Sequence, residues 1–290
     1  MPPVSLDVVV PAVRRATIGR LLESLARNTV RPDAVSIVSN EVDTGIESHG
    51  LNMRLLRFRS GEYPIGDRDV ALRRNVGIWS SECSHVLTLD DDVVAPANLI
   101  ETSLGLLHDE RYFWGHYRYI SLSGYTLERL SDLPPELGRR RENPPNSWHL
   151  WMSCYAGAFG AERELLEQLG GFDLAFSCRH GGEDQSLGKR LAAHVAGTER
   201  VFIHEPPFVW HPNEPEEWET PSHSNLCEGA HDVEEASVNG LAVTKCRRCP
   251  WFTAANEARL FSGEVFLPYD PDAVEVTVER PEPSRAKAPA

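Results

Sequence analysis

Three consecutive aspartates follow an apolar run in the segment SHVLTLDDDVV, residues 84–94. Neighbouring carboxylates repel one another and are costly to remove from water, so Asp90, Asp91 and Asp92 need either a solvated turn or a bound cation. Mg²⁺ and Mn²⁺ prefer oxygen ligands and are often held by one or two carboxylates together with substrate phosphates. In an extended chain Asp90 and Asp92 point the same way, because side chains alternate along a strand. The run alone is compatible with an acidic turn and with a metal site.

A second pair of carboxylates, Glu183 and Asp184, lies in the segment GGED at residues 181–184, at the start of a predicted helix. The glycines allow close backbone approach, and the N-terminal end of a helix favours ionised carboxylates. A positioned, ionised carboxylate can take the proton of an attacking hydroxyl group. The alternative is a pair of acidic residues that caps a surface helix.

Strand and helix patterns alternate through the first 110 residues and position the aspartate run. The predicted strands are residues 6–10, 34–38, 53–58 and 85–89, and the predicted helices are residues 17–28, 68–79 and 96–107. This alternation indicates βαβ units in an α/β fold, with a mainly parallel sheet flanked by helices. Ligands of such sheets bind at the carboxyl ends of the strands, where residues 90–92 lie.

The pattern changes after residue 111. Residues 112–127 alternate and are rich in aromatic side chains, which predicts a strand pair, and the proline-rich residues 131–147 predict a loop. Residues 157–195 then indicate strand, helix, turn and helix, and residues 200–214 hold two short apolar segments.

Four segments, taken in order, resemble the GT-A glycosyltransferases, close to glycosyltransferase family 2, and are also similar to the galactosyltransferase type with a Gly-Glu-Asp motif. The segments are VVVPAVRR (8–15), ALRRNVGI (71–78), LTLDDDVV (87–94) and GGFDLAFSCRHGGEDQSLGKRL (170–191). The resemblance implies a GT-A, Rossmann-like fold. It also implies an inverting, metal-dependent, hexosyltransferase-type enzyme that uses a nucleoside-diphosphate sugar, with a UDP-sugar favoured.

The resemblance implies which residues bind the donor. Asp92 would be a ligand of Mn²⁺ or Mg²⁺, and Asp90 would contact the ribose or assist the metal. His211 would be the histidine ligand that related enzymes place after a short strand, with His204 as its rival. For Arg74 the alternative is a surface salt bridge. The other donor-site residues implied are Pro11, Ala12, Val13, Asn40, Glu41, Asn75 and Asp91, together with Arg74.

The chain departs from the family pattern after the second predicted strand. Such families usually place an aspartate there that bonds the base, whereas this chain reads SIVSNEVD, with Asn40 or Glu41 in that neighbourhood. An amide both donates and accepts, so Asn40 can still read a uracil edge.

By match to the family motif, Asp184 would be the general base and Glu183 would orient the acceptor sugar. The base would remove the proton of the acceptor hydroxyl as that oxygen attacks the anomeric carbon. The bound cation would stabilise the departing diphosphate as a Lewis acid.

Four residues near the C-terminus have spacing typical of a structural zinc site. They form the patterns His223-x3-Cys227 and Cys246-x2-Cys249. His231 is a rival ligand, and free thiols or a disulfide are the alternatives to Zn²⁺. Such a site would fix an acidic segment onto the catalytic domain.

Composition limits the partners. Hydrophobic residues make up 41% and charged residues 25% of the 290 residues, and the formal net charge is −14. The negative charge argues against nucleic acid and against an anionic membrane as partners. No apolar run is long enough to span a bilayer, the N-terminal residues do not resemble a signal peptide, and six cysteines are too few for a disulfide scaffold. We expect a cytoplasmic enzyme with a soluble acceptor, such as a small molecule, a sugar or a peptide.

We expect a catalytic domain at 1–215, with a nucleotide-sugar half at about 1–110 and an acceptor half at about 111–215. A Cys/His-containing appendage at 216–267 and a disordered tail at 268–290 would follow. One alternative is a nucleotidyltransferase acting on a sugar phosphate, although PAVRRATIG lacks the glycines of its phosphate loop. The other is a non-catalytic protein that binds a nucleotide-sugar.

Overall fold

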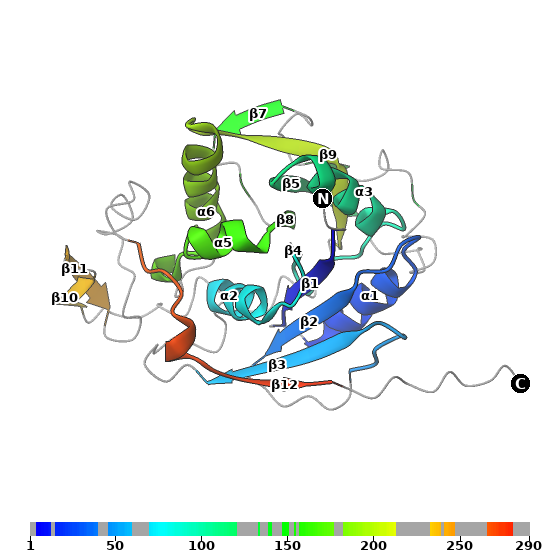
Figure 1. Ribbon diagram of the computed structural model, residues 1–290, viewed down its shortest axis with the longest axis horizontal. Helices are drawn as coiled ribbons and strands as arrows, with labels where there is room; N and C mark the ends of the chain where they lie inside the picture. Colours follow the sequence, from blue (N-terminus) through cyan, green and yellow to red (C-terminus); the bar gives the residue numbers. More distant parts are fainter. Residues whose placement is uncertain are drawn as a thin grey trace, which may run out of the picture.

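The computed structural model describes residues 4–12, 15–39, 46–59, 70–120, 133, 139–140, 147–150, 154, 157–176, 182–212, 233–238, 241–246 and 266–280. Within these residues the chain forms a ten-stranded mixed sheet with helices on both faces (Figure 1). The strand order is β12-β3-β2-β1-β4-β8-β5-β9-β7, and β6 pairs with β5. The expected α/β architecture is confirmed.

Four parallel strands form the N-terminal part of the sheet in the order β3-β2-β1-β4. Their bounds are β1 (Leu6–Pro11), β2 (Ala34–Ser39), β3 (Met53–Arg59) and β4 (His85–Leu89). All six residues of β1 are buried, because helices cover both of its faces. These strands are the ones that the alternating sequence pattern predicted, and they place residue 90 at the carboxyl edge of the sheet.

Three helices cover the two faces of this parallel part. They are α1 (Arg15–Ala26), α2 (Val70–Ser80) and α3 (Leu99–Asp109). Val8 and Val10 of β1 pack in one buried cluster with α1 and α3, whereas Val9 packs in another with α2. This alternation follows from the twofold periodicity of a strand. Among the described residues, we find no helix that combines the length and the apolar character needed to cross a bilayer.

The second half of the chain continues the same sheet. Its strands are β5 (Tyr112–Ile120), β6 (Arg139–Arg140), β7 (Ser147–Leu150), β8 (Ala158–Glu162) and β9 (Arg200–Pro212). β8 is antiparallel to both β4 and β5, and β9 is parallel to β5. Helices α5 (Arg163–Gln168) and α6 (Glu183–Leu191) pack in the buried cluster that also contains α2. The two apolar segments expected at 200–214 are thus one continuous strand.

The prediction of a disordered tail from residue 268 is wrong for the residues described there. Residues 275–279 form β12 (Glu275–Glu279), which pairs antiparallel with β3 at the edge of the sheet. Tyr269 and Val274 are buried in the cluster with α2. Charged residues obscured the alternating pattern of β12 in the sequence. Pairing with the edge strand β3 stabilises β12, because β3 would otherwise leave its backbone groups on that side unpaired. Within the expected appendage, β10 (Val233–Val238) and β11 (Leu241–Cys246) pair as an antiparallel hairpin.

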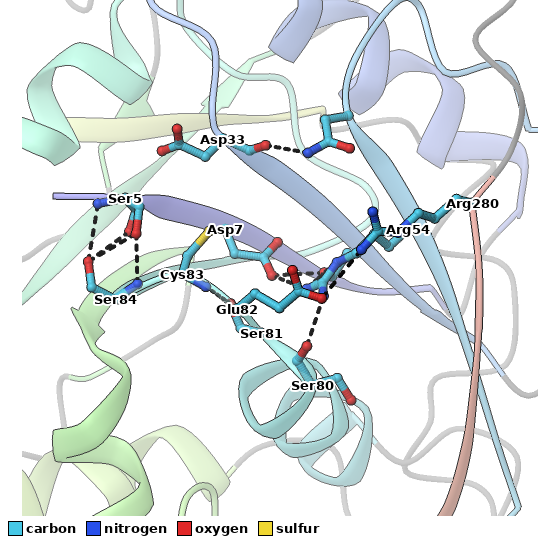
Figure 2. Close-up of polar contacts among 12 residues, drawn as sticks. Ser5, Asp7, Asp33, Arg54, Ser80, Ser81, Glu82, Cys83, Ser84 and Arg280 are labelled. Atoms are coloured by element: carbon cyan, nitrogen blue, oxygen red, sulfur yellow. Dashed lines mark hydrogen bonds and ion pairs between the residues drawn. The ribbon is translucent and has the colours of Figure 1, made fainter. Parts of the chain in front are cut away.

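A buried ionic cluster lies at the amino ends of the parallel strands, whereas residue 90 follows the carboxyl end of β4. Figure 2 shows Asp7 and Arg54 of this cluster. Asp7 of β1 is fully buried and accepts hydrogen bonds from Arg54 of β3 and from Ser36 of β2. Arg54 also donates to the carbonyl oxygen of Ser80 at the end of α2, at 2.8 Å. This cluster therefore joins three strands and one helix at the end of the sheet away from the aspartate run.

Candidate active site

The aspartate run forms a turn directly after β4. Val94 then makes a short antiparallel bridge to Trp210 of β9, with hydrogen bonds of 2.8 and 3.0 Å in the two directions. The bridge brings the turn against the end of β9. As a result, Oδ2 of Asp92 lies 3.6 Å from Nε2 of His211. The two residues proposed as metal ligands from the sequence are neighbours, although 119 positions separate them in the chain (211 − 92).

The chemistry of this pair fits a divalent cation. Nδ1 of His211 lies 3.0 Å from the carbonyl oxygen of Pro212, and because a carbonyl only accepts, Nδ1 must donate. In the neutral ring Nε2 then presents a lone pair toward Asp92, so that two acceptors face each other. A carboxylate together with an imidazole nitrogen suits Mn²⁺. In the described part of the chain no three His, Cys, Asp or Glu side chains form a metal-binding group.

Arg74 of α2 connects the two carboxylate sets. Its Nη2 lies 2.8 Å from Oδ1 of Asp90, and its Nη1 lies 2.7 Å from Oδ1 of Asp184 and 3.1 Å from Oε1 of Glu183. The guanidinium carbon lies 5.0 Å from the ring centre of Phe172. The turn after β4 and the start of α6 therefore meet at one arginine, and Arg74 is not on the surface.

The charge balance around Arg74 favours its protonated form. Burial alone would lower the pKa of Arg74, but the charges of Asp184, Asp90 and Glu183 outweigh that effect and raise it. A buried guanidinium that is always charged can neutralise carboxylates from separate segments. The carboxylates can thus lie together without mutual repulsion dominating.

Tyr117 of β5 is a site residue that the sequence reasoning missed. Its hydroxyl donates to Oδ2 of Asp90, so Arg74 and Tyr117 hold the two oxygens of that carboxylate. Burial, followed by the charge of Asp90 and the hydrogen bond to it, raises the pKa of Tyr117 well above its usual value. The rings of Tyr117 and Tyr119 also pack against His211, at 5.6 and 5.3 Å between ring centres. The aromatic alternation of residues 112–119 was the available signal.

The start of α6 is shaped by Gly182. This residue is the N-cap with a φ of +111°, and a Cβ atom there would lie 2.4 Å from Cδ1 of Phe176. Only glycine fits both the backbone conformation and the space. Glu183 and Asp184 then occupy the first turn, where the helix dipole favours negative charge.

The carboxyl ends of β1 and β2 are held together by Arg73, a second residue that was not predicted. Its Nη1 donates to the carbonyl oxygens of Ala12, at 2.9 Å, and Val38, at 3.2 Å. Pro11 ends β1 and pairs with Val38 of β2. Ala12 therefore lies at the edge where a donor site was expected. Val13, Asn40 and Glu41, also expected there, lie outside the described residues.

Asn75 of α2 bonds to the backbone of Phe172. It is fully buried, its Nδ2 donates to the carbonyl oxygen of Phe172 at 2.8 Å, and its Oδ1 accepts from the Phe172 amide at 2.7 Å. A Cβ atom on Gly171 would lie 2.3 Å from Oδ1 of Asn75. Asn75 thus fixes the backbone at Phe172, whose ring lies under Arg74, and its role at the donor stays a prediction.

Several expected residues lie away from this cluster or beyond what the structure describes. His204, the rival of His211, packs against Phe202 with 4.8 Å between ring centres, and burial lowers its pKa. Asp91 is buried next to Asp92 in the turn. The zinc prediction is untested: Cys246 ends β11, and the other members of the set are His223, Cys227 and Cys249, outside the described residues.

Solved structures of similar fold include residues 1–349 of S. aureus TarS in complex with UDP, with a TM-score of 0.50 and 17% identity over 74% of this chain and 62% of that one. GalNAc-T7 with UDP, GalNAc and Mn²⁺ has a TM-score of 0.53 and 14% identity, over 78% of this chain and 47% of that one. The chain thus spans less than two thirds of the length of these structures. No protein-family model and no curated protein matches the sequence.

At these identities the likeness is one of fold. The neighbours are GT-A-type glycosyltransferases, and the large sheet of this chain, flanked by helices, matches their α/β fold. The resemblance inferred from the four sequence segments is confirmed at that level, whereas family 2 and the Gly-Glu-Asp type stay predictions. The protein has a GT-A-type α/β fold.

Proposed function

We propose that the protein is an inverting, metal-dependent glycosyltransferase. It would move a sugar from a nucleoside-diphosphate sugar, with a UDP-sugar favoured, to a soluble hydroxyl acceptor. The observation that carries the proposal is the convergence on Arg74 of Asp90, from the end of β4, and of Glu183 and Asp184, from the start of α6. A sugar transferase needs one group for the leaving diphosphate and another for the acceptor proton, and the two segments supply them side by side.

The leaving-group side consists of Asp92 and His211, which would hold Mn²⁺ or Mg²⁺. When bound, the cation supplies charge stabilisation for the diphosphate oxygens. Tyr117 and Arg74 keep Asp90 in place next to this pair. The bound nucleotide in TarS and the UDP, GalNAc and Mn²⁺ in GalNAc-T7 support this assignment by analogy of fold.

The acceptor side consists of Glu183 and Asp184. The acceptor oxygen attacks the anomeric carbon from the face opposite the diphosphate, its proton passes to Asp184, and the bond from the anomeric carbon to the diphosphate breaks. The neighbouring guanidinium and the start of α6 both favour the ionised carboxylate that accepts a proton. Glu183 would orient the acceptor.

The first test is turnover of a panel of sugar nucleotides with sugar, peptide and small-molecule acceptors. We expect one donor to release its nucleoside diphosphate. This release should stop when EDTA is added and resume when Mn²⁺ is supplied. If none of the sugar nucleotides in the panel is turned over, the proposal is contradicted. Formation of a sugar nucleotide and pyrophosphate from a nucleoside triphosphate and a sugar phosphate would instead indicate the nucleotidyltransferase alternative.

The second test is Asp184→Asn, which keeps the shape of the side chain but removes the base. We expect transfer to fall by at least about 100-fold, the lower end of what a general base contributes, while calorimetry shows unchanged binding of UDP with Mn²⁺. Glu164→Gln is the matched control, because Glu164 is an exposed acid in the first turn of α5. A fully active Asp184→Asn would remove the base assignment. Binding without transfer by the wild-type protein would indicate the non-catalytic alternative.

A further inference from the structure

The segment after residue 265 returns to the region just before α6. The amide of Leu267 donates to Oδ1 of Asp173, and its carbonyl oxygen accepts from the amide of Leu174, both at 3.0 Å. The amide of Tyr269 donates to the carbonyl oxygen of Gly170 at 3.1 Å. Residues 267–269 thus bind along the turn that leads toward the proposed base.

The carboxylate of Asp173 is the centre of these contacts. It is 1% exposed and accepts three hydrogen bonds of 3.0 Å, from the amides of Ala175 and Leu267 and from the hydroxyl of Ser186. Each donor belongs to a different element: the turn, the C-terminal segment and α6. A buried carboxylate that loses a donor carries a desolvation penalty, so the three segments are held to one geometry.

Two contacts carry that geometry to the start of α6. Ser186 lies two residues after Asp184 in the same helix, and its amide donates to the carbonyl oxygen of Gly182 at 2.9 Å. Phe176, three residues after Asp173, packs against Gly182 so closely that no side chain fits there. The turn at Asp173 therefore supports both the N-cap of the helix and its second turn.

The other end of the C-terminal segment is fixed to the parallel half of the sheet. Its strand β12 pairs with β3, and the ring of Tyr269 packs on Trp79 of α2 with 4.9 Å between ring centres. Figure 1 shows the segment passing beside α2 before it reaches β3. Helix α2 carries Arg74, the partner of Asp184. One segment thus contacts the helix that carries the arginine and the turn that supports the helix of the base.

We propose that Asp173 is a positioning residue, through which the C-terminal segment sets the start of α6 and so the place of Asp184 opposite Arg74. The inference rests on the proposed function, since Asp184 must be the base for its position to affect the rate. Small displacements of a reacting group lower rates steeply, and a shift of about 1 Å can cost about 100-fold. The loss of one supporting hydrogen bond should displace the carboxylate of Asp184 by less than that distance.

The test is Ser186→Ala, which removes one donor to Asp173 and leaves the helix intact. We expect kcat for transfer to fall about 10-fold with the KM of the donor within about twofold, since Ser186 reaches the site only through Asp173 and α6. Ser186→Thr keeps the hydroxyl and should recover most of the rate. Ser103→Ala is the control, because Ser103 is a buried helical serine whose hydroxyl makes no hydrogen bond among the described residues. An unchanged kcat in Ser186→Ala, with or without a lower melting temperature, would overturn the proposal.

A second pair of variants tests the C-terminal segment without relying on turnover. Leu267→Pro removes the amide that donates to Asp173, whereas Leu267→Ala keeps it. We expect faster hydrogen exchange at residues 184–187 in Leu267→Pro than in Leu267→Ala. Equal exchange in the two variants would overturn the proposal. If the wild-type protein turned over no sugar nucleotide while exchange changed as expected, the proposed function would fail and the structural link would stand.

Discussion

At the scale of single residues, Arg74 is the group on which the candidate site depends. It is buried and contacts three carboxylates that belong to two segments of the chain. A guanidinium can reach Asp90 with one nitrogen and Asp184 with the other, because its donors form a planar fork. An ammonium group is a single point of charge and cannot span both.

We therefore expect Arg74→Lys to be strongly impaired despite the retained charge. Breaking a buried ion pair costs about 3–5 kcal/mol, and part of that should appear in the free energy of unfolding measured with urea. The rate of transfer should also fall by at least about 10-fold, because Asp184 loses its fixed partner. Arg111→Lys is the control, because Arg111 forms a partly exposed ion pair with Glu162, outside the candidate site. Near-normal turnover in Arg74→Lys would show that the charge, not the fork, is what the site needs.

The buried hydroxyl group of Tyr117 should make the free energy of unfolding depend on pH. Burial raises its pKa in the folded protein well above the value of about 10 that applies in the unfolded chain. A raised pKa means that the stability from this group is complete below pH 10 and is lost as the pH rises above it. Tyr112 behaves likewise, since burial raises its pKa to about 12.

The free energy of unfolding should therefore fall between pH 9.5 and pH 11, and fall less steeply in Tyr117→Phe and in Tyr112→Phe. Urea denaturation at several pH values measures the slope. The double variant should be the flattest of the set. A slope identical to that of the wild-type protein in both single variants would contradict the burial of these hydroxyl groups.

At the scale of elements, the packing of α2 on β1 decides where Arg74 lies. Gly77 of α2 approaches β1 so closely that a Cβ atom would lie 2.3 Å from Cγ1 of Val9. Helices that pack this tightly on a strand need a residue without a side chain at the contact. The register of α2, and hence the direction of Arg74, follows from this contact.

Gly77→Ala should lower the free energy of unfolding by about 1–3 kcal/mol, because overpacking outweighs the gain in helix propensity. Gly19→Ala in α1 and Gly105→Ala in α3 are matched controls, since no atom lies within 4 Å of the added Cβ in either. In each control variant the free energy of unfolding should rise by up to about 1 kcal/mol. Urea denaturation compares the three variants. A Gly77→Ala protein as stable as the controls would mean that α2 does not pack as described.

At the scale of the whole molecule, the two ends of the parallel strands have different tasks. The carboxyl ends bear the candidate site, and the amino ends bear the cluster of Asp7, Ser36 and Arg54. Figure 2 labels Asp7 and Arg54 of this cluster. Asp7→Asn removes the buried counter-charge of Arg54 and leaves it with the exposed Glu82, 3.9 Å away. We expect a loss of about 3 kcal/mol in the free energy of unfolding with little change in kcat of the folded enzyme. Asp33→Asn, an exposed acid that accepts from the Leu6 amide, is the control.

Much of the fold was accessible from the sequence because its signals are local. Runs such as residues 6–10 and 85–89 carry the apolar continuity of buried parallel strands, and residue 90 follows the last of them. The order strand, helix, strand then places Asp90 at the carboxyl edge of the sheet. Such patterns extend over a few residues, so neither long-range packing nor an alignment is needed to read them.

The contacts that complete the site could not be predicted in this way. Arg74 meets Asp184 across 110 positions, Asn75 meets Phe172 across 97, and Asp173 meets Leu267 across 94. No periodicity of the sequence encodes which side chains of distant elements meet, because that depends on how the helices pack and how the sheet is ordered. For the same reason Tyr117 was missed and β12 was taken for a disordered tail.

The sequence by itself therefore determined the α/β architecture and the residue types of the site, since both follow from local patterns and from carboxylate chemistry. Only the tertiary structure decided which carboxylates share one arginine, which tyrosine holds Asp90 and which segment supports α6. The physical reason is that burial removes water as the competing partner. A buried charge or amide must then find its partner within the fold, wherever in the chain that partner lies.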